Sequence, residues 1–159
     1  MPQSYAQAAN GQATQNPQPV DGEPIDLKGK RVVVVEDEGI TQMQLRRILM
    51  RAGIILAGAA FNGQEGVAVT LREHPDIVLM DIRMPMMNGL EATRRILEAA
   101  PMCVIMMTGF ADLEYQEQAE QIGASGYIQK PLTADTLLPQ MEAAYRRFLD
   151  RQTGGPSSP

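Results

Sequence analysis

Short apolar runs alternate with longer amphipathic stretches through most of the chain. A continuous run such as RVVVV, at the first of them, is typical of a strand that is buried on both faces of a sheet. On the same grounds we expect strands at Arg31–Val35, Ile54–Ala60, Ile77–Met80, Met102–Met107 and Gly126–Gln129.

Helical spacing of apolar residues follows these runs. After the first run they recur at positions i, i+3, i+4 and i+7, and Gly53 then supplies a helix end. These residues are Leu45, Ile48, Leu49 and Ala52. Further helices are expected at about Gln64–Glu73, from the capping residue Asn88 to about Ala100, at about Asp112–Ile122 and at about Thr133–Leu149. Pro139 falls inside the last helix, which should therefore either start late or kink.

The repeated alternation of strand and helix predicts an α/β fold, with a doubly wound parallel sheet and helices on both of its faces. The two ends of the chain do not share this pattern. Residues 1–28 are rich in Gln, Ala, Asn, Pro and Gly, so we expect a disordered tail there and a short flexible tail at 151–159. The expected organisation is a single folded domain over residues 29–150.

Charge and cysteine content narrow the possible partners. With 19 acidic and 14 basic residues the formal net charge is −5, which argues against direct binding to nucleic acid. The single cysteine, Cys103, lies in an apolar run, and we expect it to be buried in a protein of a reducing compartment. A secretory signal and a membrane-spanning apolar stretch are not recognisable, so we expect a cytoplasmic protein without membrane contact.

Polar side chains stand at the ends of four of the predicted strands. They are Glu36, Asp37 and Glu38 after the first strand, Asp81 after the third, Thr108 at the end of the fourth, and Lys130 with Pro131 after the fifth. Ligands of open α/β sheets bind beyond the carboxyl ends of the strands. We therefore expect these side chains to converge on one edge of the sheet.

The chemistry of such a cluster is specific. Crowded carboxylates repel each other, and each is pushed toward its protonated form unless a cation lies among them. Mg²⁺ fits best, because it binds through one or two carboxylates and keeps several waters. A carboxylate can also attack phosphorus and form an aspartyl phosphate, while a metal, an ammonium and a hydroxyl stabilise the transferring group. The residues thus predict an Mg²⁺-assisted phosphoryl acceptor.

Four motifs, in order along the chain, resemble those of response-regulator receiver domains. VVVVEDE (Val32–Glu38) resembles their acidic metal-binding turn, DIRMPMMNGLE (Asp81–Glu91) their D-x-x-M-P-x-M-x-G-x-E signature, MMTGF (Met106–Phe110) their strand-four switch, and GASGYIQKP (Gly123–Pro131) their lysine–proline segment. The resemblance covers about residues 29–150. It implies a stand-alone receiver with a flavodoxin-like fold of five β–α units and the strand order 2-1-3-4-5.

The resemblance also implies the acceptor and the metal ligands. Asp81 would take a phosphoryl group from a histidine kinase or a histidine phosphotransfer protein. Mg²⁺ would be bound by the side chains of Asp37 and Asp81 and by the backbone carbonyl of Arg83, with Glu36 acting largely through bound water. The chain would not be an enzyme beyond its own phosphorylation and slow dephosphorylation.

Lys130, Thr108 and Tyr127 receive the remaining roles that the resemblance implies. Lys130 would pair with the phosphoryl group, next to a cis peptide before Pro131. Thr108 would swing toward the phosphate and Tyr127 would turn inward behind it. Phe110, two residues beyond Thr108, would shield the phosphoryl group from water and slow its loss.

Other functions fit part of the pattern. A flavodoxin-type mononucleotide binder needs a Gly/Ser/Thr-rich phosphate cradle after the first strand, where Glu36, Asp37 and Glu38 would repel phosphate. An aspartate-based phosphatase needs a second acid two residues after its nucleophile, and Arg83 occupies that place. A receiver-like interaction module that works without phosphorylation is the alternative function, although its usual mark, a missing acid, Thr or Lys, is not found.

We expect the output to be contact with a separate protein, because only a short segment follows the last predicted helix. In the family, the face of the fourth helix, fifth strand and fifth helix commonly changes on activation. The acidic residues of the fourth helix are Asp112, Glu114, Glu117 and Glu120. They favour an effector with basic residues, or a homodimer in which Arg146 and Arg147 are the counter-charges.

Overall fold

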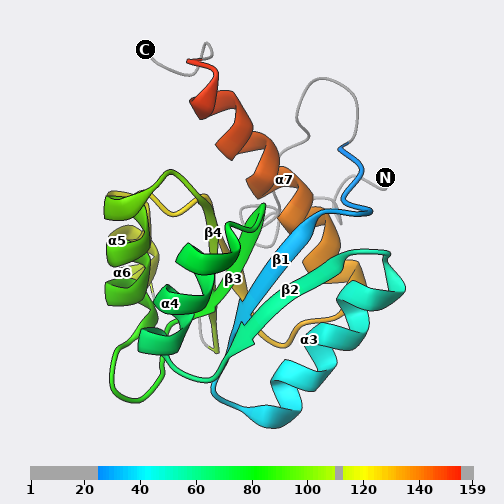
Figure 1. The fold of residues 1–159 in the computed structure, drawn as a ribbon, viewed down its shortest axis with the longest axis horizontal. Coiled ribbons are helices and arrows are strands. Elements are labelled where there is room, and N and C mark those ends of the chain that lie inside the picture. Colours follow the sequence, from blue (N-terminus) through cyan, green and yellow to red (C-terminus); the bar gives the residue numbers. More distant parts are fainter. Residues whose placement is uncertain (1–24, 110–112, 155–159) are drawn as a thin grey trace, which may run out of the picture.

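The computed structural model describes residues 25–109 and 113–154, in which strands and helices alternate as predicted (Figure 1). The elements are β1 (Arg31–Val35), α3 (Gly39–Arg51), β2 (Ile55–Ala60), α4 (Gly63–Glu73), β3 (Ile77–Asp81), α5 (Gly89–Ala99), β4 (Cys103–Thr108), α6 (Leu113–Gln121), β5 (Gly126–Gln129) and α7 (Ala134–Gln152). Within the described ranges, none of the helices has both the length and the apolar composition needed to cross a bilayer.

The strands form one parallel sheet in the order β2-β1-β3-β4-β5, which confirms the predicted topology. Helices α3 and α7 pack on one face of the sheet, and α4, α5 and α6 pack on the other (Figure 1). Because β2 and β3 lie on opposite sides of β1, the direction of winding reverses between β1 and β3. Open α/β sheets bind ligands at such a reversal, beyond the carboxyl ends of the strands.

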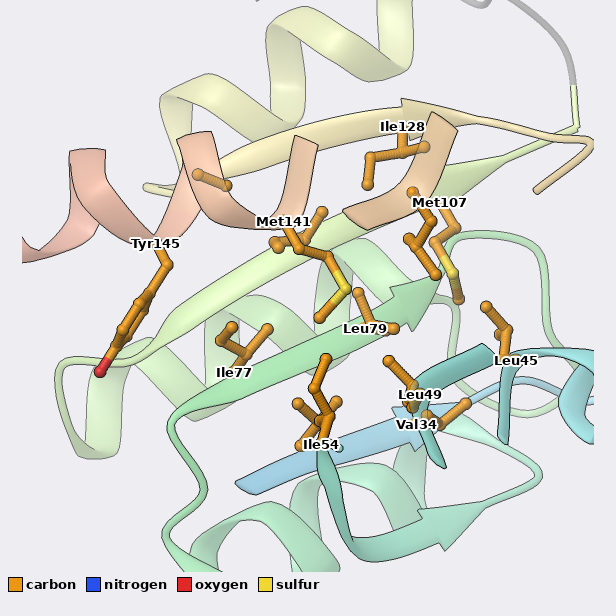
Figure 2. Packing of buried hydrophobic residues seen from close by; sticks show 14 of the residues in the cluster. Val34, Leu45, Leu49, Ile54, Ile77, Leu79, Met107, Ile128, Met141 and Tyr145 are labelled. Carbon is orange, nitrogen blue, oxygen red and sulfur yellow. The ribbon is translucent and has the colours of Figure 1, made fainter. Parts of the chain in front are cut away.

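An apolar core lies on each face of the sheet. Side chains of a strand point alternately to opposite faces, so the valines of Val32–Val35 are divided between the two cores. In the core beneath α3 and α7, Leu49, Leu79 and Met141 bring a helix, a strand and a second helix together (Figure 2). Cys103 lies in the same core, buried as predicted, and burial raises the pKa of its thiol to about 12.

Two strands run one residue further than predicted, and both extra residues are candidates for function. Asp81 is the last residue of β3, and Thr108 is the last residue of β4. Strand pairing is made by backbone groups, so a polar side chain at the rim of the sheet does not end the strand. The sheet itself therefore holds Asp81 and Thr108, which the sequence pattern had placed at or just beyond the strand ends.

Helix α7 does not start late, which was one of the two alternatives predicted for it. Oγ1 of Thr133 accepts a hydrogen bond from the N–H of Thr136 at 3.2 Å, and Oγ1 of Thr136 accepts one from the N–H of Thr133 at 3.0 Å. This capping box fixes the first turn, so the helix begins at Ala134 and continues through Pro139. The prediction of a late start is wrong, whereas a kink at Pro139 stays a prediction.

The first described residues close the end of the sheet where the strands begin. Ile25 and Leu27 pack against the core beneath α7, and the N–H of Ile25 donates to Oε2 of Glu142 at 2.9 Å. The ammonium of Lys30 lies 5.8 Å from the centroid of the Tyr145 ring, which is within range of a cation–π interaction. Residues just before the predicted domain, which begins at residue 29, thus contribute to its packing.

Helix α5 approaches the end of β3 very closely. Its N-cap is Asn88, whose Oδ1 accepts a hydrogen bond from the N–H of Glu91 at 3.0 Å, as the predicted cap requires. The N–H of the next residue, Gly89, donates to the carbonyl of Ile82 at 2.7 Å. A Cβ atom at Gly89 would lie 2.0 Å from the carbonyl oxygen of Asp81. A glycine is therefore required where the helix meets the candidate site.

We predict that Gly89→Ala lowers the free energy of unfolding by about 1–3 kcal/mol, the usual cost of forcing extra volume into a packed region. Gly39→Ala is the matched control, because Gly39 also begins a helix and a Cβ there meets nothing within 4 Å. We expect the control to be neutral or stabilising by about 0.4–1 kcal/mol. Urea unfolding measures both values, and equal midpoints for the two variants would contradict the steric argument.

Candidate functional site

The turn after β1 is held by backbone and amide groups. The N–H of Glu36 donates to the carbonyl of Ala60 at 3.0 Å. The buried side-chain amide of Gln42 donates to the carbonyl of Glu36 at 3.2 Å and to that of Ala60 at 3.0 Å. Sequence reasoning missed Gln42. Its signal was spacing alone, since it shares the buried face of α3 with Leu45 and Leu49.

Three carboxylates meet at the edge of the sheet where these turns lie. Oxygen atoms of Glu36, Asp37 and Asp81 all lie within 4.8 Å of one another. The exposed fractions of Glu36 and Asp81 are 0% and 5%, whereas Asp37 is exposed. The predicted convergence of the acids that follow the first and third strands is therefore present.

Lys130 reaches the same carboxylates from the end of β5. Its Nζ lies 2.8 Å from Oε1 of Glu36 and 3.4 Å from Oδ1 of Asp81. The backbone N–H of Lys130 donates to the carbonyl of Thr108 at 2.7 Å, and the peptide bond between Lys130 and Pro131 is cis, as the resemblance implied. The ion pair with Glu36 was not predicted, because sequence spacing cannot show which acid a lysine on another strand will meet.

The two expected switch residues lie on the neighbouring strands. Thr108 is buried at the end of β4, the strand that pairs with the strand of Asp81. Tyr127 is half-buried on β5 and packs against the core beneath α4, α5 and α6. Thr108 is thus brought to the edge of the sheet that carries the three acids, whereas Tyr127 lies two residues before the end of β5 and so further from that edge. The expectations for Phe110 and Asp112 fall outside the described residues.

A hollow of about 290 Å³ opens between the acids and Lys130. At the volume of liquid water this space holds about ten water molecules, so a metal ion with its waters can enter. Arg83, the predicted source of a backbone ligand, is exposed and lines the hollow. Its guanidinium lies over the ring of Tyr115 on α6, with 5.6 Å between the central carbon and the ring centroid. Sequence reasoning did not identify Tyr115.

The edge of the sheet that carries Glu36, Asp37 and Asp81 has more negative than positive charge. Burial, followed by the negative charge of Glu36, raises the pKa of the Asp81 carboxyl from 3.8 to about 7. The charge and hydrogen bond of Lys130 act to lower the pKa of Asp81, but they do not offset the effects of burial and of Glu36. For the ammonium of Lys130, burial acts to lower the pKa, but the hydrogen bond with Glu36 and the charge of Asp81 raise it overall. Lys130 alone is therefore not enough to hold the pKa of Asp81 at its usual value.

The donor set fits a hard divalent cation. Mg²⁺ prefers carboxylate and carbonyl oxygens, and it keeps several waters when it binds to a protein. The carboxylates of Asp37 and Asp81 lie close together and line the hollow from its exposed and its buried side. A cation between them would favour the ionised form of Asp81, which burial disfavours.

Comparison with known proteins identifies the family. The family model "Response regulator receiver domain" matches residues 32–142. The chain belongs to this receiver family. A receiver domain is a phosphorylation-dependent signalling switch, and its family binds Mg²⁺ at an acidic pocket. In this chain, Glu36, Asp37 and Asp81 form an acidic cluster.

Relatives of the receiver include regulators and chemotaxis proteins. It is 34% identical over 119 residues to the transcriptional regulatory protein PdtaR of Mycobacterium tuberculosis, which covers 75% of this chain and 58% of PdtaR. It is 38% identical over 104 residues to the chemotaxis protein CheY of Thermotoga maritima, which covers 65% of this chain and 87% of CheY. Because the receiver spans little more than half of PdtaR, the activity of that whole protein is not carried over.

A solved structure supports the same fold. The crystal structure of the CheX–CheY–BeF₃–Mg²⁺ complex from Borrelia burgdorferi contains a chain that matches the receiver with a TM-score of 0.72. The two chains are 27% identical, and the match covers 74% of the receiver and 90% of that chain. The five-stranded parallel sheet with helices on both faces is thus the architecture of known CheY-like proteins.

We predict that the metal-free receiver loses stability as the pH rises from about 4 to about 7. Because the pKa of Asp81 is raised to about 7, the folded protein keeps a proton that the unfolded chain has lost. This stabilising contribution is complete below pH 3.8 and is lost as the pH passes about 7. At about 1.4 kcal/mol per pKa unit, it amounts to roughly 4 kcal/mol.

Asp81→Asn should remove this pH dependence and exceed the wild type in stability at pH 8, with little difference at pH 4. Asp150→Asn, at an exposed acid on α7, is the control and should keep the wild-type dependence. Urea unfolding in the presence of a chelator, repeated across this pH range, measures the effect. A wild-type pH dependence in Asp81→Asn would show that another group carries it.

Proposed function

We propose that Asp81 is the phosphoryl acceptor of this receiver, and that a histidine kinase or a histidine phosphotransfer protein is the donor. One observation carries the proposal: the buried carboxylate of Asp81 ends β3 beside two further acids and a lysine, in an open hollow where the winding of the sheet reverses. The related complex from Borrelia burgdorferi contains BeF₃ and Mg²⁺. An anionic group paired with a cation is also what this hollow is suited to hold.

In the proposed reaction, an oxygen of the ionised Asp81 carboxylate attacks the phosphorus of a phosphohistidine. A P–O bond forms, the P–N bond breaks, and its electron pair stays on the imidazole nitrogen. Bound Mg²⁺ supplies positive charge that neutralises the transferring group. The ammonium of Lys130, which lies 3.4 Å from Oδ1 of Asp81, pairs with the phosphoryl oxygens, and the hydroxyl of Thr108 donates to one of them.

The proposed magnesium ligands are two side chains and one backbone group: Asp37, Asp81 and the carbonyl of Arg83. Glu36 acts through bound water. Support for this indirect role comes from its own hydrogen bonds. Oε1 of Glu36 accepts from Lys130 at 2.8 Å, and Oε2 accepts from the N–H of Glu38 at 3.0 Å. Both carboxylate oxygens of Glu36 are therefore already engaged by protein donors.

We assign the conformational switch to Thr108, which moves toward the phosphoryl group, and to Tyr127, which turns inward behind it. Tyr127 lines a surface hollow of about 330 Å³ whose walls come from α6, β5 and α7. A change in the Tyr127 side chain would therefore reshape this face, which is the proposed site for an effector protein.

The face of α6, β5 and α7 carries opposite charges on its two helices. The exposed acids of α6 are Glu114, Glu117 and Glu120. On α7, Nε of Arg147 donates to the carbonyl of Ser125 at 3.1 Å, and Nη2 of Arg151 donates to Oγ of Ser125 at 2.7 Å. A separate effector with basic residues fits the acidic side. A second receiver fits both sides, because a two-fold axis would bring Arg146 and Arg147 of each copy to the acids of the other.

We predict that the receiver incubated with acetyl phosphate and Mg²⁺ gains the mass of one phosphoryl group. Asp81→Asn should gain none, and neither should the wild type in the presence of a chelator. Asp135→Asn, which changes an exposed acid on α7, is the control and should be phosphorylated like the wild type. Intact mass spectrometry measures all four samples. Lack of any gain in the wild type would favour the interaction module that works without phosphorylation.

We predict that the double change Glu117→Lys/Glu120→Lys weakens partner binding of the phosphorylated receiver by about two- to thirtyfold at low salt, since each of the two exposed ion pairs contributes about 0.2–1 kcal/mol. Glu98→Lys, which reverses an exposed charge on α5 outside this face, is the control. Sedimentation of the receiver with BeF₃⁻ and Mg²⁺ measures self-pairing. For a separate effector, the measurement is the affinity of the BeF₃⁻-bound receiver for a protein that this form captures. Unchanged affinity at low salt would exclude this surface.

A further inference from the structure

Arg83 links the acidic hollow to α6. It lines this hollow together with the three acids and Lys130. A second hollow of about 400 Å³ adjoins it, and Arg83 and Asp37 line both. Tyr115 of α6 lines the second hollow, with its ring centroid 5.6 Å from the central carbon of the Arg83 guanidinium. This distance is within range of a cation–π interaction.

The ring of Tyr115 is a fixed support for this contact. Tyr115 is half-buried and packs against the core beneath α4, α5 and α6. Arg83, in contrast, is exposed in the loop after β3. A guanidinium that stacks on an aromatic ring uses its face, so the N–H donors in its plane remain directed sideways toward anions. Tyr115 therefore restricts the orientations of a long, exposed side chain.

A charge count explains why a second cation is useful in the hollow. Glu36, Asp37 and Asp81 together carry three negative charges, which Lys130 and one Mg²⁺ balance. Phosphorylation replaces the single charge of the Asp81 carboxylate with a group that carries nearly two at neutral pH. Among the described residues that line the hollow, one further negative charge then has no balancing cation other than Arg83, and the exposed Glu38 adds to the excess of negative charge. The guanidinium of Arg83, which also lines the hollow, is a cation that can balance this charge.

We propose that Tyr115 positions Arg83 as a second cation for the phosphoryl group on Asp81, and that the same contact transmits phosphorylation to α6. The inference rests on the proposed function, since it requires an anionic group at Asp81. The guanidinium binds the phosphoryl oxygens through its edge while its face stays on the ring. Phosphorylation then orders Arg83, and Arg83 holds the first turns of α6, which belongs to the proposed partner face.

The test is calorimetric titration of the receiver with beryllium fluoride in the presence of Mg²⁺. Arg83→Met and Tyr115→Leu should each weaken binding by about three- to tenfold, the range expected for losing a cation–π contact or the cation itself. Tyr115→Phe is the matched control, because it keeps the ring face and should bind like the wild type. The double variant Arg83→Met/Tyr115→Leu should bind no more weakly than Arg83→Met alone, because Tyr115 acts through Arg83.

Hydrogen exchange of α6 is the second readout. Beryllium fluoride should slow exchange in α6 of the wild type and of Tyr115→Phe, and have little effect there in Tyr115→Leu and Arg83→Met. A merely structural role for Tyr115 would instead speed exchange equally with and without the anion, and would leave the binding affinity unchanged. Equal affinities of Tyr115→Leu and Tyr115→Phe, or additive losses in the double variant, would overturn the inference.

The outcomes also separate this inference from the proposed function. A wild-type receiver that binds no beryllium fluoride and gains no mass from acetyl phosphate would refute both. Normal binding and phosphorylation of the wild type, together with unchanged affinity in Tyr115→Leu, would refute only the role of Tyr115 and Arg83.

Discussion

The site depends on an excess of negative charge that the fold holds in place. Two buried carboxylates, Glu36 and Asp81, share the single ammonium of Lys130, and Asp37 lies beside them. Burial and like charge both disfavour the ionised form of Asp81. The resulting cost in stability is tolerated because two large apolar cores hold the strands from both faces. The same excess makes the edge of the sheet receptive to a cation, and the cation in turn makes the carboxylate receptive to phosphorus.

Much of this arrangement could be predicted from the sequence. Buried strands appear as continuous apolar runs, so the alternation of strands and helices was visible, and with it the edge on which Asp37, Asp81 and Lys130 meet. The strand order came from the resemblance, because an alternating pattern alone does not say which strands are neighbours. The cap at Asn88 was predictable because capping is a local interaction between residues three apart.

What could not be predicted depends on distances between elements. The hydrogen bonds of Gln42, the ion pair of Glu36 with Lys130 and the contact of Arg83 with Tyr115 all join residues that are remote in sequence or differently placed on their helices. None of these contacts is marked in the sequence by a characteristic composition or residue spacing. Helix α7 continues through Pro139, and the late start that was one of the two predicted alternatives is wrong for a related reason. Local rules weigh the lost hydrogen bond, but not the capping box and the packing that hold the helix on both sides of it.

The depth of Cys103 has a practical consequence for following the motions of this receiver. The sequence contains one cysteine, and its thiol lies in the core with a pKa raised to about 12. At neutral pH this thiol is protonated and buried away from solvent, so alkylating reagents will not react with it. A thiol introduced on the surface of α6 could then be labelled selectively with a fluorophore or a spin label. Such a reporter would leave the native core untouched.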